Sequence, residues 1–298
     1  MRLRAATRGS PLARWQADHI AALLSAVDPA LEPEAVVVTT TGDRDRTRPL
    51  AEMGGKGVFV KEVQAAVLDG RADLAVHSAK DLPSTTPDGL VIAAVPERAD
   101  PRDALVGRAL AELPPGSRIA TGSARRRSQL AAHRPDLTFV GLRGNMDTRL
   151  GAAADHGAVV VAIAALDRLD RSAEAAEVLD PAIVLPQAGQ GTLAVECRAD
   201  DEATRALLAA IDHESSHRTL RAERAFLAEL GGDCDIPAGA YAVVDGDGDG
   251  LKVEGLIASL DGHVVLRHTV TGADPEATGR TVARFLLDEA GGSAILQP

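Results

Sequence analysis

The chain has 298 residues, of which 45% are hydrophobic, and this is enough material for the cores of two or three domains. A formal net charge of −11 and an aromatic content of 2% argue against a nucleic acid partner, because base stacking needs aromatic rings and a polyanion needs positive charge. The chain has two cysteines, no sustained apolar stretch near the N-terminus and no run of about 18 apolar residues, so we expect a cytoplasmic protein that does not span a membrane.

The first part of the chain alternates short apolar runs with helical patterns, which is typical of an α/β fold with parallel strands. Ser10 and Pro11 predict the start of an amphipathic helix, as N-cap and first helical residue. In order, we expect a strand at 3–7, that helix with Leu12, Trp15, Leu23 and Leu24, a strand at 35–40, a polar loop at 41–57, and a helix with Phe59, Val60, Val63 and Val67 on one face.

The pattern breaks at residues 96–101, which indicates a connection into a second α/β unit. We expect strands of that unit at 118–121, 137–142 and 158–164, and a strand at 189–196 that returns to the first domain. From Asp212 on we expect a helix, three β-like runs at 240–244, 251–260 and 263–271, and a helix at 275–290. The predicted domains are 1–96 with 189–211, then 97–188, then an α+β domain at 212–298.

Arginines follow several of the predicted strands, at Arg8, Arg125, Arg143 and Arg168. In parallel α/β sheets, ligands bind beyond the carboxyl ends of the strands. Guanidinium groups bind carboxylates and phosphates bidentately, so this pattern predicts a ligand with several acidic groups. A single arginine of this kind is more often a solvated surface charge than part of a site, but the position that the four share, after predicted strands, favours a common site.

The segment 73–83 runs from a buried-strand pattern straight into ionisable residues. Lys80 is one of four lysines, against 28 arginines, and it stands next to Asp81. A compact ammonium group binds anions differently from a planar guanidinium, so a lysine at this position in an arginine-rich chain indicates a binding site. A solvated turn after a strand remains the alternative.

Three further patterns imitate metal or phosphate sites. His213–His217 matches H-E-x-x-H, but no third ligand completes the extended form, and a helix start with satisfied histidines is the better interpretation. Residues 245–250 imitate a calcium loop, but Leu256 stands where a glutamate is needed, which favours a hairpin turn. Residues 54–57 lack the Ser or Thr of a phosphate loop. We therefore expect no metal site.

Six segments, in this order along the chain, make it resemble the porphobilinogen deaminase (hydroxymethylbilane synthase) family over nearly its whole length. They are Ala6–Ala13, Gly54–Glu62, Val76–Pro83, Glu97–Asp103, Leu142–Asn145 and Glu223–Phe226, the last leading to Cys234. The resemblance implies two α/β domains similar to those of periplasmic binding proteins, and a third, small α+β domain at the C-terminus. It also implies a transferase of tetrapyrrole biosynthesis, acting as a monomer, whose substrate is porphobilinogen.

The same resemblance implies a covalent dipyrromethane cofactor, one per chain, held by a thioether to Cys234. Asp233 and Ala238 depart from the residues usual in the family's cysteine loop, and the carboxylates of Asp233 and Asp235 beside the thiol should raise its pKa and slow loading. The resemblance assigns cofactor binding to Ser78, Lys80, Thr121, Ser123, Arg125, Arg126, Arg143 and Arg149. It assigns substrate binding to Arg8, Ser10, Gln16, Lys56, Phe59 and Arg168.

The implied reaction adds four porphobilinogen units in turn, expels ammonia and passes through a cationic azafulvenium. A single carboxylate stabilises such a cation better in a partly dry cleft than in water, and we assign that role to Asp81. Nearby arginines should keep Asp81 ionised, which favours cation stabilisation over proton donation. The rival hypothesis is a two-lobed solute-binding or effector-sensing protein without catalysis.

Overall fold

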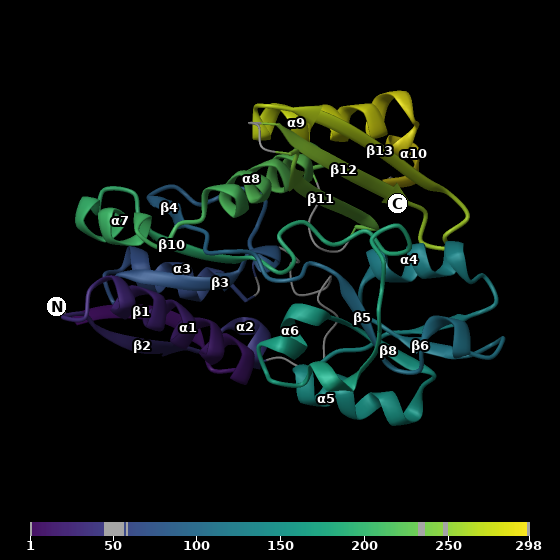
Figure 1. Ribbon diagram of the computed structural model, residues 1–298, viewed down its shortest axis with the longest axis horizontal. Coiled ribbons are helices and arrows are strands. Elements are labelled where there is room, and N and C mark those ends of the chain that lie inside the picture. Colours follow the sequence, from purple (N-terminus) through teal and green to yellow (C-terminus); the bar gives the residue numbers. More distant parts are fainter. Residues whose placement is uncertain (1, 45–56, 58, 232–235, 247–249, 297–298) are drawn as a thin grey trace. The chain divides into compact units, whose positions relative to one another are not determined.

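The computed structural model describes residues 2–44, 57, 59–231, 236–246 and 250–296 (Figure 1). The chain divides into two compact units, Met1–Ala99 with Thr192–His217, and Asp100–Gly191 with Arg218–Pro298. In the described residues the first unit contains one β-sheet and the second contains two. The predicted α/β class with a small C-terminal sheet is confirmed, whereas the three domain boundaries stay a prediction.

The sheet of the first unit has five strands in the order β2-β1-β3-β10-β4. They are β1 (Arg2–Arg8), β2 (Glu32–Val38), β3 (Leu74–Ser78), β4 (Leu90–Ala94) and β10 (Leu193–Arg198). β1 is parallel to β2 and β3, as predicted. β10 returns to this sheet, also as predicted, but it runs antiparallel to both β3 and β4.

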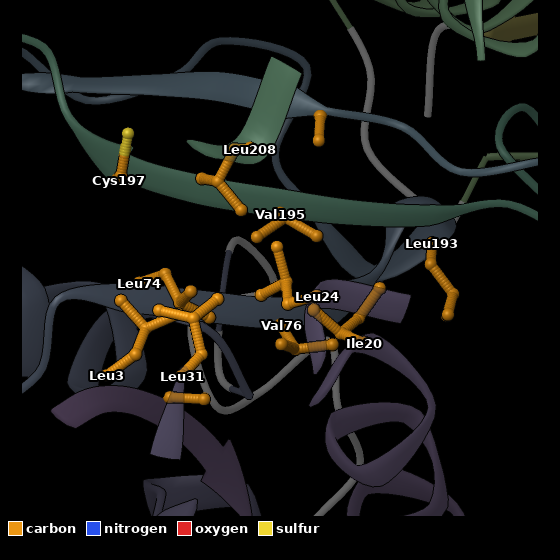
Figure 2. Packing of buried hydrophobic residues seen from close by; sticks show 12 residues of the cluster. Leu3, Ile20, Leu24, Leu31, Leu74, Val76, Leu193, Val195, Cys197 and Leu208 are labelled. Atoms are coloured by element: carbon orange, nitrogen blue, oxygen red, sulfur yellow. The ribbon is translucent and has the colours of Figure 1, made fainter. Parts of the chain in front are cut away.

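Helices cover both faces of this sheet. α1 (Pro11–Val27) begins where Ser10 accepts a hydrogen bond from the Ala13 N–H at 3.3 Å, as its N-cap position predicts. It packs with α7 (Glu202–Ala209) against the cluster drawn in Figure 2, which includes Val76. α3 (Lys61–Leu68) packs on the other face, because Ala75 belongs to its cluster and neighbouring strand residues point to opposite sides.

The first sheet of the second unit has the order β7-β6-β8-β5-β9. Its elements are β5 (Asp103–Gly107), β6 (Arg118–Ala120), α4 (Ala124–His133), β7 (Thr138–Val140), α5 (Met146–Gly151), β8 (Ala158–Ala162), α6 (Ile163–Asp167) and β9 (Ala175–Val178), with 3-10 turns η3 (Leu110–Glu112), η4 (Ala152–Asp155) and η5 (Ser172–Glu174). The expected strand 158–164 is two residues too long, because α6 already begins at Ile163. Both sides of that boundary are apolar, so hydrophobicity alone does not mark it.

The second sheet of this unit is the antiparallel β11-β12-β13. Its elements are α8 (Glu214–Glu229), β11 (Ala238–Val244), β12 (Leu251–Ala258), β13 (Val265–Gly272), α9 (Pro275–Arg284), a π-helical turn η6 (Phe285–Glu289) and α10 (Gly292–Leu296). Phe226 of α8 and Val282 of α9 are fully buried in the same cluster. Strands flank residues 245–250, and the Asp245 N–H donates to the Gly250 carbonyl at 2.8 Å, as a hairpin requires.

Candidate active site

A pocket of about 50 Å³ opens at the carboxyl ends of β1 and β3 in the first unit. Its polar lining residues come from β1, α1, β3 and the turns beside them. They are Arg8, Ser10, Gln16, His77, Ser78 and Asp81, and apolar residues including Phe59, Val60 and Val76 complete the wall. Of the residues assigned from the sequence, six therefore line one pocket: Arg8, Ser10, Gln16, Phe59, Ser78 and Asp81.

Local contacts fix several of these side chains. The Gln16 side chain is buried and donates from Nε2 to Ser78 Oγ at 2.8 Å. The guanidinium carbon of Arg8 lies 4.1 Å from the centre of the Phe59 ring, which is a cation–π geometry. Arg8 is thus held against the pocket wall.

Lys80 and Asp81 lie on η2 (Ala79–Asp81), the 3-10 turn that directly follows β3. The Ala79 N–H donates to the Thr192 carbonyl at 3.0 Å, and the Leu82 N–H donates back to Ala79 at 3.2 Å. These bonds fix the turn between the strand and the proline that follows. Lys80 is half-buried, and Asp81 is exposed while still lining the pocket.

A buried polar cluster lies behind the pocket and was not predicted. Glu196 of β10 is fully buried, and its two carboxylate oxygens accept from Gln64 Nε2 of α3 at 3.1 and 2.9 Å. His77 Nε2 lies 3.1 Å from Glu196 Oε2. The sequence signal for this cluster is a glutamate inside the apolar run 192–197, which a buried strand does not otherwise accommodate.

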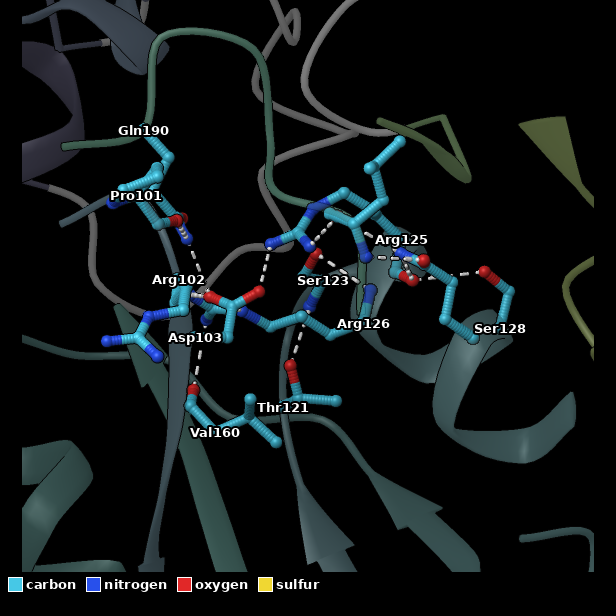
Figure 3. Close-up of polar contacts among 12 residues, drawn as sticks. Pro101, Arg102, Asp103, Thr121, Ser123, Arg125, Arg126, Ser128, Val160 and Gln190 are labelled. Carbon is cyan, nitrogen blue, oxygen red and sulfur yellow. Dashed lines mark hydrogen bonds and ion pairs between the residues drawn. The ribbon is translucent and has the colours of Figure 1, made fainter. Parts of the chain in front are cut away.

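Arg125 and Arg126 of the second unit share one buried carboxylate, that of Asp103 on β5 (Figure 3). Arg125 NH2 donates to Asp103 Oδ2 at 2.7 Å, and Arg126 donates from Nε and NH2 to Oδ1 at 3.0 and 2.6 Å. Gln190 Nε2 adds a fourth donor at 2.8 Å. The structure therefore places both arginines in an internal ion pair, while their role toward a cofactor stays a prediction.

These charges perturb one another. Burial alone would raise the pKa of Asp103, but the two guanidinium groups outweigh it and lower that pKa well below its ordinary value. Burial lowers the pKa of Arg125, and the carboxylate of Asp103 opposes this change. The cluster holds one negative and two positive groups, so it carries excess positive charge.

The other assigned residues of the second unit occupy turns and helix starts. Ser123 caps α4 by accepting from the Arg126 N–H, and its own N–H donates to Thr121 Oγ1 at 3.2 Å. Arg149 Nε donates to the Gly144 carbonyl at 3.0 Å, and Arg143 is half-buried before α5.

Arg168 donates from NH2 to the Gly191 carbonyl at 2.7 Å. Burial lowers the pKa of Arg168 to about 10, so the group remains positively charged at neutral pH. The predicted convergence of this arginine and the others of the second unit with the pocket of the first stays a prediction.

Several assigned residues lie outside the part of the chain that the structure describes. They are Lys56 and Cys234, with its neighbours Asp233 and Asp235, and most of the polar loop predicted at 41–57. The described start of that loop forms a short helix, α2 (Thr41–Arg44).

The two histidines of the H-E-x-x-H pattern contact their own helix start. His213 Nδ1 lies 2.8 Å from Ser216 Oγ, and His217 Nδ1 lies 2.8 Å from Asp212 Oδ1. Among the residues that the structure describes, no group of three or more His, Cys, Asp and Glu side chains could hold a metal ion. None of the described helices is long and apolar enough to cross a membrane.

Comparison with known proteins accounts for nearly all of the chain. A family model described as "Porphobilinogen deaminase, dipyromethane cofactor binding domain" matches residues 3–206, and "Porphobilinogen deaminase, C-terminal domain" matches residues 217–288. The porphobilinogen deaminase of Nitratidesulfovibrio vulgaris (strain DSM 19637 / Miyazaki F) is 44% identical over 303 residues, which cover 98% of this chain and 95% of that protein. That of Chromobacterium violaceum is 48% identical over 290 residues, covering 95% and 93%.

Likeness to solved structures is more distant. An arginine-specific periplasmic binding protein of Salmonella typhimurium overlaps 70% of this chain and 91% of its own, at 14% identity and a TM-score of 0.37, which is too low to carry a conclusion. The two family models and the full-length relatives carry the assignment instead. They confirm the resemblance seen in the sequence, and the chain belongs to the porphobilinogen deaminase family.

Proposed function

We propose that this chain performs the reaction of its family with Asp81 as the catalytic carboxylate of the pocket. The chain is a hydroxymethylbilane synthase, a transferase of tetrapyrrole and heme biosynthesis that works on a dipyrromethane cofactor. It adds four porphobilinogen molecules in turn and releases the linear tetrapyrrole by hydrolysis. The observation that carries the assignment of Asp81 is its position at a pocket that also presents Arg8, Ser10 and Gln16.

The charge and polarity of the pocket suit both a carboxylate-bearing substrate and a cationic intermediate. Arg8 provides a guanidinium for a substrate carboxylate, and Ser10 provides a hydroxyl. Asp81 provides the negative charge that stabilises the cation formed when ammonia leaves. For substrate binding we keep the full set Arg8, Ser10, Gln16, Lys56, Phe59 and Arg168.

The donors assigned to the cofactor fit a group that carries several carboxylates, since each is a cation or a hydroxyl. They are Ser78, Lys80, Thr121, Ser123, Arg125, Arg126, Arg143 and Arg149. When bound, dipyrromethane supplies the pyrrole ring to which the first substrate unit is joined. These residues hold and orient it through its acidic side chains.

Cys234 is the proposed attachment site, and the surroundings of the other cysteine support this choice. Cys197 is fully buried in the apolar cluster of Figure 2. Burial, with a smaller contribution from the charge of Asp201, raises the pKa of Cys197 to about 11, so its reactive thiolate is scarce at neutral pH. A packed, inert thiol at Cys197 leaves Cys234 to form the thioether.

Asp81→Asn tests the catalytic assignment. We expect the variant to keep its cofactor and bind substrate but to lose turnover by at least about 100-fold, because the amide carries no charge to stabilise the cation. Steady-state rates and intact mass measure both properties. Asp88→Asn, an exposed acid in the loop just beyond, is the matched control and should keep its rate. Near-normal turnover of Asp81→Asn would overturn the assignment.

Cys234→Ser tests the attachment site by intact mass alone. We expect this variant to have the mass of the bare chain, whereas Cys197→Ser should keep the added mass of dipyrromethane. Cofactor on Cys234→Ser would move the attachment elsewhere. An unaltered chain with neither cofactor nor turnover would instead favour the rival hypothesis of a two-lobed carboxylate-binding protein. We further infer that the enzyme is cytoplasmic, in keeping with the free, buried thiol of Cys197, and that it acts as a monomer.

A further inference from the structure

His77 and Glu196 lie on the same face of the sheet in the first unit. β3 and β10 pair antiparallel with His77 opposite Ala194 and Glu196 opposite Ala75, so the two side chains are diagonal neighbours. The 3.1 Å separation of His77 Nε2 and Glu196 Oε2 is an ion-pair distance, but the two atoms do not form a hydrogen bond. Glu196 therefore acts on the ring mainly through its charge.

Because Glu196 is buried, its carboxylate has a strong electrostatic effect on the neighbouring His77 ring. A fully buried carboxylate is costly unless a donor or a cation compensates it, and Gln64 contributes a neutral donor to Glu196. Glu196 consequently stabilises positive charge on the imidazole whenever His77 takes up a proton. The side chain of His77 is 6% exposed, yet it lines the pocket beside Asp81.

The chemistry of the pocket includes a proton transfer in addition to the stabilisation of the cation. Each added unit replaces a C–H bond of a pyrrole by a C–C bond and releases the amino group of the substrate. One proton therefore leaves the α-carbon for every ammonia expelled. Asp81 is assigned to balance the cation, which leaves the acceptor of that proton to be identified.

We propose that His77 is this acceptor and that Glu196 is its positioning residue, an inference that rests on the proposed function. Nδ1 of His77 takes the proton as the C–H bond breaks, and the bonding electrons restore the aromatic ring. Glu196 stabilises the imidazolium from the Nε2 side. The proton then passes to solvent, where the ammonia expelled in the earlier step takes it up, so each turn ends with unprotonated His77 and one ammonium ion.

The test uses porphobilinogen carrying deuterium at its free α-carbon, with the cofactor-loaded enzyme. We expect His77→Gln, whose amide still reaches toward Glu196, to lower turnover by about 100-fold or more. Loss of the base should make proton removal rate-limiting, so a primary deuterium isotope effect should appear. Intact mass should show partly elongated covalent complexes accumulating. Glu196→Gln should show the same isotope effect with a smaller loss of rate.

Glu223→Gln is the matched control, because Glu223 is another fully buried carboxylate, which accepts from the backbone N–H groups of Gly189 and Ala242. It should alter stability without an isotope effect. The proposal is overturned if the turnover of His77→Gln is within about threefold of that of the unaltered chain and shows no isotope effect. It is also overturned if His77→Gln folds but lacks cofactor. If His77→Gln does not fold, Glu196→Gln decides by the same isotope effect. Failure of the unaltered enzyme to use porphobilinogen would instead refute the proposed function.

Discussion

At the scale of single residues, Asp103 pairs with two arginines that the sequence alone assigns to ligand binding. Two arginines that the sequence places after a strand, where a ligand would bind, lie against this carboxylate in the second unit. Asp103 itself is fully buried and its pKa is lowered, because burial is outweighed by the two guanidinium groups. The cluster therefore serves the stability of the fold whatever else it binds.

Asp103→Asn should lower the free energy of unfolding by about 3 to 5 kcal/mol, because it leaves buried guanidinium groups without their carboxylate. Urea denaturation measures this loss. Asp136→Asn is the control, since its ion pair with Arg134 is exposed and should matter little. A loss for Asp103→Asn no greater than that of the control would show that the fold does not depend on the buried pair.

The pH dependence of the same stabilisation follows from the direction of the shift. The pKa of Asp103 is lower in the folded chain than its unfolded value of about 3.9. Its contribution is then fully present above about pH 4 and is lost as the pH falls toward the folded pKa. Stability measured from pH 6 down to pH 3 should fall more steeply for the unaltered chain than for Asp103→Asn, and equal slopes would contradict the pairing.

At the scale of elements, the close approach of α8 and α9 depends on a glycine. A Cβ atom at Gly279 would lie 2.1 Å from the Ala222 carbonyl oxygen of α8. Gly279→Ala should therefore force the helices apart and destabilise the fold by about 1 to 3 kcal/mol or more. Gly151→Ala on α5 is the matched control, because open space surrounds that position and its backbone is helical. Similar unfolding midpoints in urea for the two variants would contradict this packing.

Sequence patterns predict an element well when its own residues carry the signal. β1 and α1 were predicted with nearly their observed bounds, since apolar periodicity and the N-cap Ser10 are local. β4, β5 and β9 were not predicted. β5 begins at Asp103, and a buried strand can contain this carboxylate only because arginines of α4 pair with it. β9 contains Glu177 and two alanines, so its sequence lacks the apolar pattern that predicts a strand.

The candidate site follows the same rule. The identities of its strand-end residues, such as Arg8 and Asp81, could be predicted from motifs and from the edge of a parallel sheet. The pairing of His77 with Glu196 could not, because it depends on the register of β10 against β3, two strands that are far apart in the sequence. An isolated glutamate in an apolar strand signals that a partner exists without naming it.

At the scale of the whole molecule, each unit has hydrophobic clusters of its own. The core of the first contains Leu24, Leu74 and Val195, and that of the second contains Leu105, Ile119 and Val160. The chain nevertheless passes between the units three times, after residues 99, 191 and 217. Separate cores allow each unit to open locally without exposing the other.

Hydrogen exchange of two variants tests this independence. Asp103→Asn should raise the exchange rates of β5, which carries the altered carboxylate, and of its neighbours β8 and β9, and leave those of β1, β3 and β10 nearly unchanged. Ile20→Ala, which removes a fully buried side chain from the cluster of Figure 2, should do the reverse. Equal increases in both units for either variant would mean that the three connecting passages make the chain unfold as one cooperative body.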